Sequence, residues 1–419
     1  MSQHPTKPET GATGRFSGGK EPRQVPKRRR ALRALMASFV TLALVDVGLS
    51  LFLIRDGLFL GHPLPPFGAM THPKQHAWLE GLGRDENEGI GRFDAELGWS
   101  WRPGASDSEG KFTTNSIGAR GKREYPEHPP AGTTRVLFFG NSFTFGDEIP
   151  DHASFESILE ERHHDYEAIN FGVSGFGTDQ AWLRYRALGR ELQADAVCIG
   201  IMLENIGRNV NRYRPLWNTR TGFCGAKPRF YFDASGTLQL AAQPFATREA
   251  LRAALLGNDF IDTIGEHEYW LHKPHLWTGK LSSLGRLLGV VLAETERRPS
   301  VLWQDVDGEP FQVTLAILEG FHREALADGA RAAPVVMFPS RSALYRYGLL
   351  GRSYWQTLLD ELERRGIPYI DLIPALVRRQ QELDEQEGPM SLYYGGHLTS
   401  VGNSVVADEI HAWLAKHLP

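Results

Sequence analysis

The chain has 419 residues, of which 23% are charged and 41% are hydrophobic, so it is neither a disordered polymer nor a protein with many membrane spans. Its formal net charge of -4 is unevenly distributed. The first 33 residues carry nine basic and two acidic residues, which leaves 37 basic and 48 acidic residues in the rest of the chain. A body this acidic is a poor match for nucleic-acid phosphates, so no nucleic-acid partner is expected.

The N-terminal segment has the pattern of a membrane anchor. Residues 1–33 form a basic tail whose first part, rich in Pro, Gly, Ser and Thr, is typical of disorder. Residues 34–54 are apolar apart from Asp46, and at about 1.5 Å per residue they would span about 30 Å, the thickness of a bilayer core. The stretch is longer than a signal-peptide core and lacks an A-x-A site, so we predict an uncleaved anchor. A buried helix of a soluble protein is the alternative.

The basic residues at 27–30 (KRRR) precede the apolar stretch and predict its orientation. By the positive-inside rule the tail lies in the cytoplasm and the chain after residue 55 lies outside it. We therefore expect a single-pass protein of the inner (cytoplasmic) membrane with its main domain in the periplasm or outside. Asp46 would cost about 2.5 to 3.5 kcal/mol at mid-bilayer, so it either faces a partner helix, which hints at a membrane protein partner, or lies off-centre.

The rest of the chain predicts a linker at 55–94 and one domain at 95–419. From residue 135, apolar runs alternate with helical stretches, which is typical of a parallel sheet covered by helices on both faces. Predicted strands cover residues 135–140, 168–173, 196–203, 333–338 and 368–371. Predicted helices cover residues 154–163, 179–192, 312–326, 353–365 and 405–417. This is an α/β fold with three layers, α/β/α, and Asp151 is the expected N-cap of the first helix.

A large insertion at 210–310 interrupts the alternation. Its aromatic run at 229–233 and the following residues 237–240 predict a β-hairpin that turns at Ser235-Gly236. Residues 266–275 (EHEYWLHKPH) hold several acidic and histidine side chains, but Pro274 and the absence of an H-E-x-x-H spacing argue against a metal site. No cofactor is expected.

The two cysteines do not predict a disulfide. Cys198 lies in the third predicted strand, where a thiol is an ordinary core residue, and Cys224 lies in a Gly-rich loop. A strand interior and a distant loop give no reason to expect the short separation that a disulfide needs.

Polar residues follow the predicted strands at four places, and the carboxyl ends of parallel strands converge at one edge of the sheet. The sequence GNSFTFG at 140–146 places Ser142 after the first strand, where a hydroxyl can be exposed beside free amides. Glycines at 170–178 allow a backbone N–H to approach a ligand closely. Asn205 ends the third strand, and His397 lies on a loop before the last helix, where it can act as a general base. Taken alone, such positions are more often a turn, a cap or a surface residue than part of an active site.

Serine, glycine, asparagine and histidine in this order resemble the SGNH (GDSL-like) hydrolase superfamily. The motif at 140–143 (GNSF) resembles its first block, residues 170–175 resemble the second, whose glycine is Gly175, and Asn205 and His397 match the last two. The sequence TNSIGARG at 114–121 resembles membrane-anchored bacterial members that are associated with exopolysaccharide modification, including O-acetyl esterases and acetyltransferases. The resemblance covers residues 95–209 and 310–415 and leaves the insertion out.

The chain departs from this family in three places. Asn141 replaces the usual aspartate beside the serine, but that side chain is not the attacking group. Residues 203–206 (LENI) keep the asparagine of the third block without its usual neighbours. Tyr394 stands where the family often has an aspartate, three residues before the histidine. The histidine would then be oriented by a backbone carbonyl, in a Ser-His dyad, or by a carboxylate such as Asp384 or Glu387, or the protein is attenuated or inactive.

The resemblance implies acyl transfer. Ser142 would attack an ester carbonyl while His397 accepts its proton, and the oxyanion would be held by the Ser142 and Gly175 amides and the Asn205 side chain. We expect a serine esterase that acts on O-acyl groups, O-acetyl above all, of a cell-envelope or exported polysaccharide. A polysaccharide O-acetyltransferase of the same fold and a catalytically inactive binding or assembly subunit remain the alternatives. The aromatic insertion would supply either stacking surfaces for sugars or a small additional core.

Overall fold

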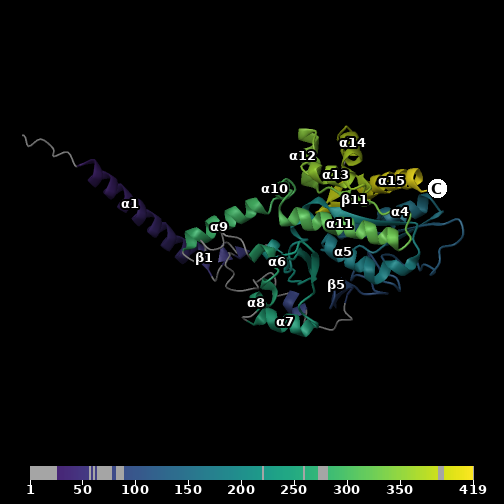
Figure 1. Cartoon of the computed structure of the whole chain (residues 1–419), viewed down its shortest axis with the longest axis horizontal. Coiled ribbons are helices and arrows are strands. Elements are labelled where there is room, and N and C mark those ends of the chain that lie inside the picture. Colours follow the sequence, from purple (N-terminus) through teal and green to yellow (C-terminus); the bar gives the residue numbers. More distant parts are fainter. Residues whose placement is uncertain are drawn as a thin grey trace, which may run out of the picture.

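The computed structural model describes residues 26–55, 58–59, 62–63, 78–81, 89–218, 221–257, 260–271, 282–385 and 391–418. An α/β domain occupies one end of the molecule, and a long N-terminal helix extends away from it (Figure 1). Most of the predicted tail and much of the predicted linker lie outside the described residues.

Five parallel strands form the central sheet. They are β6 (Thr134–Phe139), β7 (Tyr166–Asn170), β8 (Ala196–Met202), β11 (Val335–Phe338) and β12 (Tyr369–Asp371). Their order is β7-β6-β8-β11-β12, and every neighbouring pair is parallel. This is the flavodoxin-like order of a doubly wound sheet, in which the chain reverses its direction of winding between the first and third strands and leaves a crevice there. The predicted α/β fold is confirmed.

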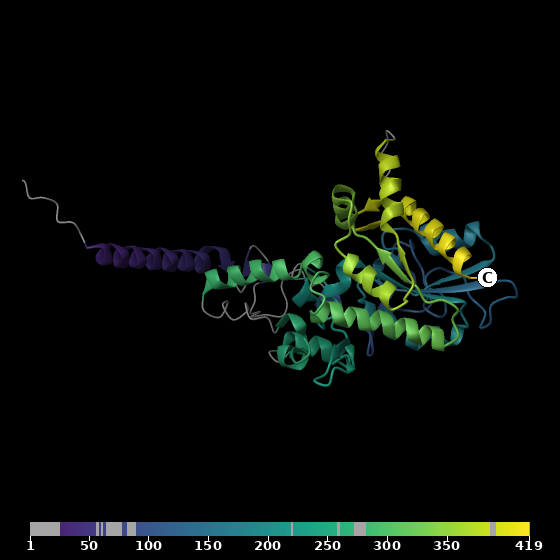
Figure 2. The same ribbon diagram turned by 45° about the horizontal axis from the view of Figure 1, so that its top comes forward.

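Helices cover both faces of this sheet and confirm the three layers (Figure 2). One face carries α4 (Phe155–Arg162), α14 (Ile373–Asp384) and α15 (Ser400–His417), and α15 packs against the other two. The opposite face carries α5 (Thr178–Arg184) and α11 (Glu309–Ala327). Arg365, which caps α13 (Gln356–Arg364), pairs with Glu319 of α11. The strands are buried on both sides, as their near-continuous apolar sequences predict.

Two element boundaries differ from the predictions. The N-cap of α4 is Ser154, whose Oγ accepts from the amide of Ser157, and not Asp151. Asp151 begins the preceding short 3-10 turn η2 (Asp151–Ala153), and its carboxylate is already bound by Thr113 and Arg120. The predicted second helix is α-helical only as α5 and continues as a π turn, η3 (Tyr185–Gly189), and a 3-10 turn, η4 (Arg190–Leu192).

The structure adds helices that the sequence pattern did not predict. One is α12 (Arg341–Leu350), and another is α14, whose N-terminal turn contains a proline. A two-stranded antiparallel hairpin, β4 (Gly91–Asp94) and β5 (Gly98–Trp101), starts inside the segment assigned to the linker.

The insertion after β8 folds as short elements. They are α6 (Arg214–Trp217), β9 (Arg229–Phe232), β10 (Leu238–Ala241), α7 (Arg248–Leu256), α8 (Phe260–Gly265), α9 (Ser283–Glu296) and α10 (Pro299–Leu302). The antiparallel pair β9-β10 confirms the predicted hairpin, with Gly236 at φ 79° in its turn. Several aromatic side chains of the insertion are buried in the main core, among them Phe230, Phe245, Phe260, Trp270 and Trp303. Much of the insertion is therefore core structure.

The N-terminal helix α1 (Lys27–Gly48) leads into a π turn, η1 (Leu49–Leu53). Residues 27–52 are long and apolar enough to cross a membrane, with a mean hydropathy of 2.0 in a window that no part of the protein buries. Asp46 accepts a hydrogen bond of 2.7 Å from the amide of Leu284, in the first turn of α9. In the structure, Asp46 therefore contacts a helix of its own chain.

Candidate active site

Ser142 stands at the edge of the sheet where β6 ends. It is the first residue of the short helix α3 (Ser142–Phe145), and Asn141 caps this helix by accepting a hydrogen bond of 2.8 Å from the amide of Phe143. A helix of this length leaves its first N–H groups without intrahelical acceptors. Asn141, which stands where the resemblance leads one to expect an aspartate, therefore acts as a helix cap. The Ser142 amide is available to bind an anion.

His397 reaches the same edge from the far end of the chain. It belongs to the antiparallel pair β13 (Tyr393–Tyr394) and β14 (His397–Leu398), just before α15. Its ring packs beside Phe143, with ring centroids 5.2 Å apart, and Ser142 and His397 line one cavity. No direct hydrogen bond joins the Ser142 hydroxyl to the imidazole within the described part of the chain. In serine hydrolases such contacts commonly tighten only when substrate binds.

Two carboxylates flank the histidine ring. Glu148 Oε1 lies 3.4 Å from Nδ1, and Asp147 Oδ2 lies 3.9 Å from Nε2. Both residues belong to the loop that follows α3. The Glu148 contact lacks the alignment of a hydrogen bond, since Nδ1 has no hydrogen-bond partner. The histidine thus has acidic neighbours, although Tyr394 is exposed to solvent and takes no part.

The structure does not bring Asp384, a candidate for the orienting acid, to this site. Asp384 ends α14 at the surface, where it accepts a hydrogen bond of 2.7 Å from Gln380. Glu387 lies outside the described residues. Asp147 and Glu148 were not predicted, and the local signal for them in the sequence is a pair of acids shortly after the serine motif.

The loop that follows α3 and carries Asp147 and Glu148, the acidic loop, is held in place by a buried arginine. Arg120 donates to the carbonyls of Phe145, Gly146 and Ile149 and pairs with Asp151 at 3.0 Å. Arg120 belongs to the motif at 114–121, so this lead-in segment supports the loop that carries Asp147 and Glu148.

The backbone at Glu148 and Gly395 brings the carboxylate close to the histidine loop. Glu148 adopts φ 72°, a left-handed conformation that is uncommon for residues other than glycine and clusters at functional sites. A Cβ at Gly395 would lie 2.5 Å from Glu148 Oε2, so only glycine allows the carboxylate this near to β14.

Asp147 is chemically different from its neighbour. Burial raises the pKa of its carboxyl group, although the hydrogen bond from Ser174 and the proximity of His397 act to lower that pKa. Ser174 precedes Gly175, so Asp147 also holds the loop after β7 that contains Gly175, the glycine loop. The main contact of Asp147 is therefore the one with Ser174, whereas the side chain of Glu148 is 37% exposed and faces Nδ1 of His397.

The predicted oxyanion donors are only partly gathered. Gly175 has φ 83° and lines the cavity together with Ser142. Asn205 lies in the 3-10 turn η5 (Leu203–Gly207), is 1% exposed, and directs Nδ2 to the carbonyl of Phe176 at 3.4 Å. The structure thus brings Ser142, Gly175 and His397 together around one cavity, whereas Asn205 is buried and does not line it.

The cavity itself has a volume of about 740 Å³ and is built from four parts of the chain. The strand ends supply polar residues, while residues 78–81, the β4-β5 hairpin and the insertion supply the walls. Its aromatic lining consists of Trp78, Phe93, Trp99, Trp101 and Phe223. The insertion thus contributes to the cavity wall through Phe223, although other aromatic residues of it are in the core.

Within the described residues, no group of three or more His, Cys, Asp or Glu side chains could hold a metal ion. His272 and His275 of the acidic and histidine-rich stretch lie outside those residues. Cys198 and Cys224 are both buried and free.

No protein-family model and no curated protein matches the chain. Several solved structures are similar to part of the chain. A member of the lipolytic protein G-D-S-L family from Veillonella parvula is 12% identical with a TM-score of 0.33, covering 68% of this chain and 100% of its own. A catalytic mutant of an acetylxylan esterase from Geobacillus stearothermophilus is 12% identical with a TM-score of 0.33, covering 69% of this chain and 96% of its own. Because these TM-scores are below 0.5, the fold assignment rests on the chain's own strand order.

Proposed function

We propose that the chain is a serine esterase that removes O-acyl groups, O-acetyl above all, from a cell-envelope or exported polysaccharide. The observation that carries this proposal is the meeting of Ser142 and His397 at one cavity, with a carboxylate 3.4 Å from the imidazole. These residues come from opposite ends of the domain and converge at the strand ends, where doubly wound sheets bind ligands.

The reaction follows from this arrangement. His397 takes the hydroxyl proton through Nε2 while Ser142 Oγ adds to the ester carbonyl, and Glu148 beside Nδ1 stabilises the imidazolium that forms. The Ser142 and Gly175 amides hold the oxyanion, each such donor being worth about 2.7 to 4 kcal/mol of barrier. The imidazolium then protonates the leaving sugar oxygen, and a water molecule releases the acid from the acyl-serine.

The polysaccharide part of the proposal rests on the cavity walls. Sugar rings stack on aromatic faces, and five aromatic side chains line a cavity large enough for more than one sugar ring. The apolar helix α1 would hold the domain at the membrane, with the basic tail in the cytoplasm and the cavity outside, where exported polymers pass. Asn205 would need to turn from the Phe176 carbonyl to join the oxyanion site.

The test is acetate release by the full-length protein in detergent, measured with a chromogenic acetyl ester and with an O-acetylated polysaccharide. We expect turnover that Ser142→Ala and His397→Ala each reduce by about 10³-fold or more. The exposed Ser108 lies outside the cavity, so Ser108→Ala serves as the matched serine control and should keep full activity. If the parent protein neither turns over an ester nor is labelled at Ser142 by a serine-directed reagent, the esterase proposal is wrong.

The same assay separates hydrolysis from transfer, because both pass through the acyl-serine. An added sugar acceptor that gains the acetyl group at the expense of free acetate would identify an O-acetyltransferase. A protein that binds the polysaccharide but never forms the acyl-serine would be a binding or assembly subunit.

A further inference from the structure

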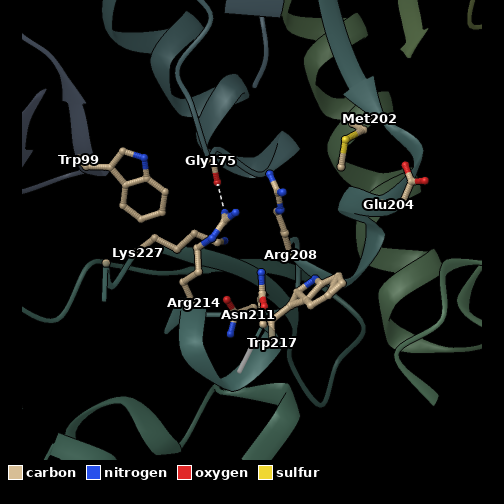
Figure 3. Close-up of a pocket in the computed structure, with 11 residues that line it drawn as sticks. Trp99, Gly175, Met202, Glu204, Arg208, Asn211, Arg214, Trp217 and Lys227 are labelled. Carbon is tan, nitrogen blue, oxygen red and sulfur yellow. Dashed lines mark hydrogen bonds between the residues drawn. The ribbon is translucent and has the colours of Figure 1, made fainter. Parts of the chain in front are cut away.

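Two arginine side chains converge beside the glycine loop of the candidate active site. Arg214 donates to the carbonyl of Gly175 at 2.8 Å, and Arg208 donates to the carbonyl of Phe176 at 3.3 Å. Figure 3 shows both guanidinium groups directed toward this loop. They line the large cavity that holds Ser142 as well as a side pocket of about 70 Å³.

Neither guanidinium is neutralised by the protein. Within the described part of the chain, no carboxylate lies within 4.0 Å of Arg208 or Arg214. By contrast, Lys227 in the same side pocket pairs with the buried carboxylate of Asp179. A guanidinium has five N–H donors, and one backbone carbonyl each leaves most of these donors directed into the pocket.

The positive charges of Arg208 and Arg214 also repel each other. Burial lowers the pKa of Arg214 to about 10, and burial together with the nearby charge of Arg214 lowers the pKa of Arg208 well below its usual value. Asp147 and Glu204 are the acidic groups that act on Arg208, but neither forms an ion pair with it. Glu204 instead accepts from Ser340, and Figure 3 shows it apart from the guanidinium groups.

Such an arrangement is costly unless an anion occupies it. Partly buried, unpaired cations lose hydration without compensation, and a bound oxyanion would restore the missing hydrogen bonds and remove the repulsion. Guanidinium groups fit carboxylate and phosphate oxygens in particular, because their planar fork matches both geometries.

We propose that Arg208 and Arg214 bind an oxyanion on the saccharide that carries the ester, so that the site selects acylated acidic saccharides over neutral ones. This inference rests on the proposed esterase function. Because the pair holds the Gly175 and Phe176 carbonyls, an anion bound there also lies next to the Gly175 amide assigned to the oxyanion. A carboxylate and a phosphate share the required chemistry, and substrates distinguish them.

The experiment compares three substrates with the full-length protein in detergent. They are an O-acetylated uronic acid oligosaccharide, its neutral carboxamide form, and an O-acetylated neutral oligosaccharide that carries one phosphate monoester. We expect kcat/KM for one of the anionic substrates to exceed that for the carboxamide about tenfold or more, the effect of one additional charge-assisted hydrogen bond.

Variants connect this preference to the arginine pair. Arg208→Gln and Arg214→Gln should bring the ratio of kcat/KM for the anionic and neutral substrates close to one. Arg92→Gln removes an equal charge from the same cavity, at an arginine 3.9 Å from Asp94, and should keep the ratio. Equal rates for all three substrates in the parent, or an unchanged ratio in both pair variants, would overturn the proposal.

Binding separates this proposal from the esterase function. Calorimetry with the deacetylated uronic acid oligosaccharide, its carboxamide and the deacetylated phosphate-bearing oligosaccharide requires no turnover. If no ester is hydrolysed but an acidic saccharide binds more tightly than the carboxamide, and this preference is lost in Arg214→Gln, the anion site stands and the esterase fails. If a neutral chromogenic ester is hydrolysed and neither acidic saccharide is preferred, the esterase stands and the anion site fails.

Discussion

Two adjacent carboxylates approach the same histidine, and their surroundings give them different roles. Glu148 is partly exposed and lies 3.4 Å from Nδ1, whereas Asp147 is bound by Ser174 and lies 3.9 Å from Nε2. A carboxylate beside Nδ1 orients the ring and stabilises the imidazolium while leaving Nε2 for the serine. In the mechanism that we propose, Glu148 therefore takes the positioning role toward His397.

Glu148→Gln tests this role. Since the amide cannot stabilise a positive imidazolium, we expect kcat to fall about 100-fold with little change in KM. Glu148→Asp keeps the charge and should retain more activity than Glu148→Gln despite its shorter side chain. Asp147→Asn is the matched comparison, and a loss of less than about tenfold is expected because Asp147 mainly supports the glycine loop. Equal losses in Glu148→Asp and Glu148→Gln would show that the charge is irrelevant.

The sequence predicted that Ser142, Gly175 and His397 lie at one edge of the sheet, but it did not predict the approach of Glu148 to His397. The first three follow strands or precede a helix, and the convergence of strand ends places such positions at one edge. The approach of Glu148 depends on a left-handed backbone and on the absence of a side chain at Gly395, which are properties of two distant loops. No local spacing rule encodes a contact of this kind.

At the scale of elements, the active-site edge depends on a segment that precedes the sheet. The Arg120 side chain is 2% exposed, and it binds three carbonyls of the acidic loop together with Asp151. Removing a buried cation leaves these acceptors unsatisfied, so Arg120→Ala should lower the free energy of unfolding by about 3 kcal/mol. Urea denaturation measures the change.

Arg162→Ala is the control for this prediction. Its partner Asp408 is 62% exposed and Arg162 itself is 42% exposed, so the loss should stay below about 1 kcal/mol. Equal effects in the two variants would mean that Arg120 does not hold the loop.

The edge strand β12 ends in a carboxyl group whose charge is disfavoured by folding. Burial raises the pKa of Asp371 from 3.8 to about 6, while a hydrogen bond from the amide of Ile373 acts to lower it. Because the folded-state pKa is raised, the protein loses stability as pH rises from about 4 to about 6. The full penalty, about 3 kcal/mol, is present above pH 6.

Asp371→Asn should remove this penalty, since an amide can still accept from Ile373. The stability difference between the variant and the parent should be near zero at pH 4 and reach its plateau above pH 6, as measured by urea denaturation across this range. A difference that does not depend on pH would contradict the assigned cause.

Helices and strands were predicted correctly where the period of the apolar residues agrees with the side of the element that is buried. The five sheet strands and the long helices α11 and α15 were predicted because their apolar patterns match one period over their length. The chain between β8 and α11 was unpredictable in detail, because short helices there are held by tertiary contacts such as the burial of Trp303 and Phe260 in the main core. The second predicted helix changes to π and 3-10 turns, which a period of 3.6 does not distinguish.

At the scale of the whole molecule, the N-terminal helix α1 and the domain are in direct contact. The carboxylate of Asp46 caps the first turn of α9, and α9 belongs to the insertion, which also forms a wall of the cavity. A negative charge at a helix N-terminus is favourable through the helix dipole. This contact gives the Asp46 carboxylate a polar partner within its own chain.

For the membrane orientation that we propose, the charges before α1 are expected to be decisive. Replacing the four basic residues at 27–30 with glutamine removes most of the positive charge next to α1, so the preference for a cytoplasmic tail should weaken and the two orientations should mix. A reporter that is active only outside the cytoplasm, fused after residue 419, measures this as a loss of activity relative to the parent. Asp46→Asn is the matched control, because acidic residues contribute little to orientation, and it should keep the parent signal. An unchanged signal in the glutamine variant would mean that the folded domain determines the orientation, independently of the tail.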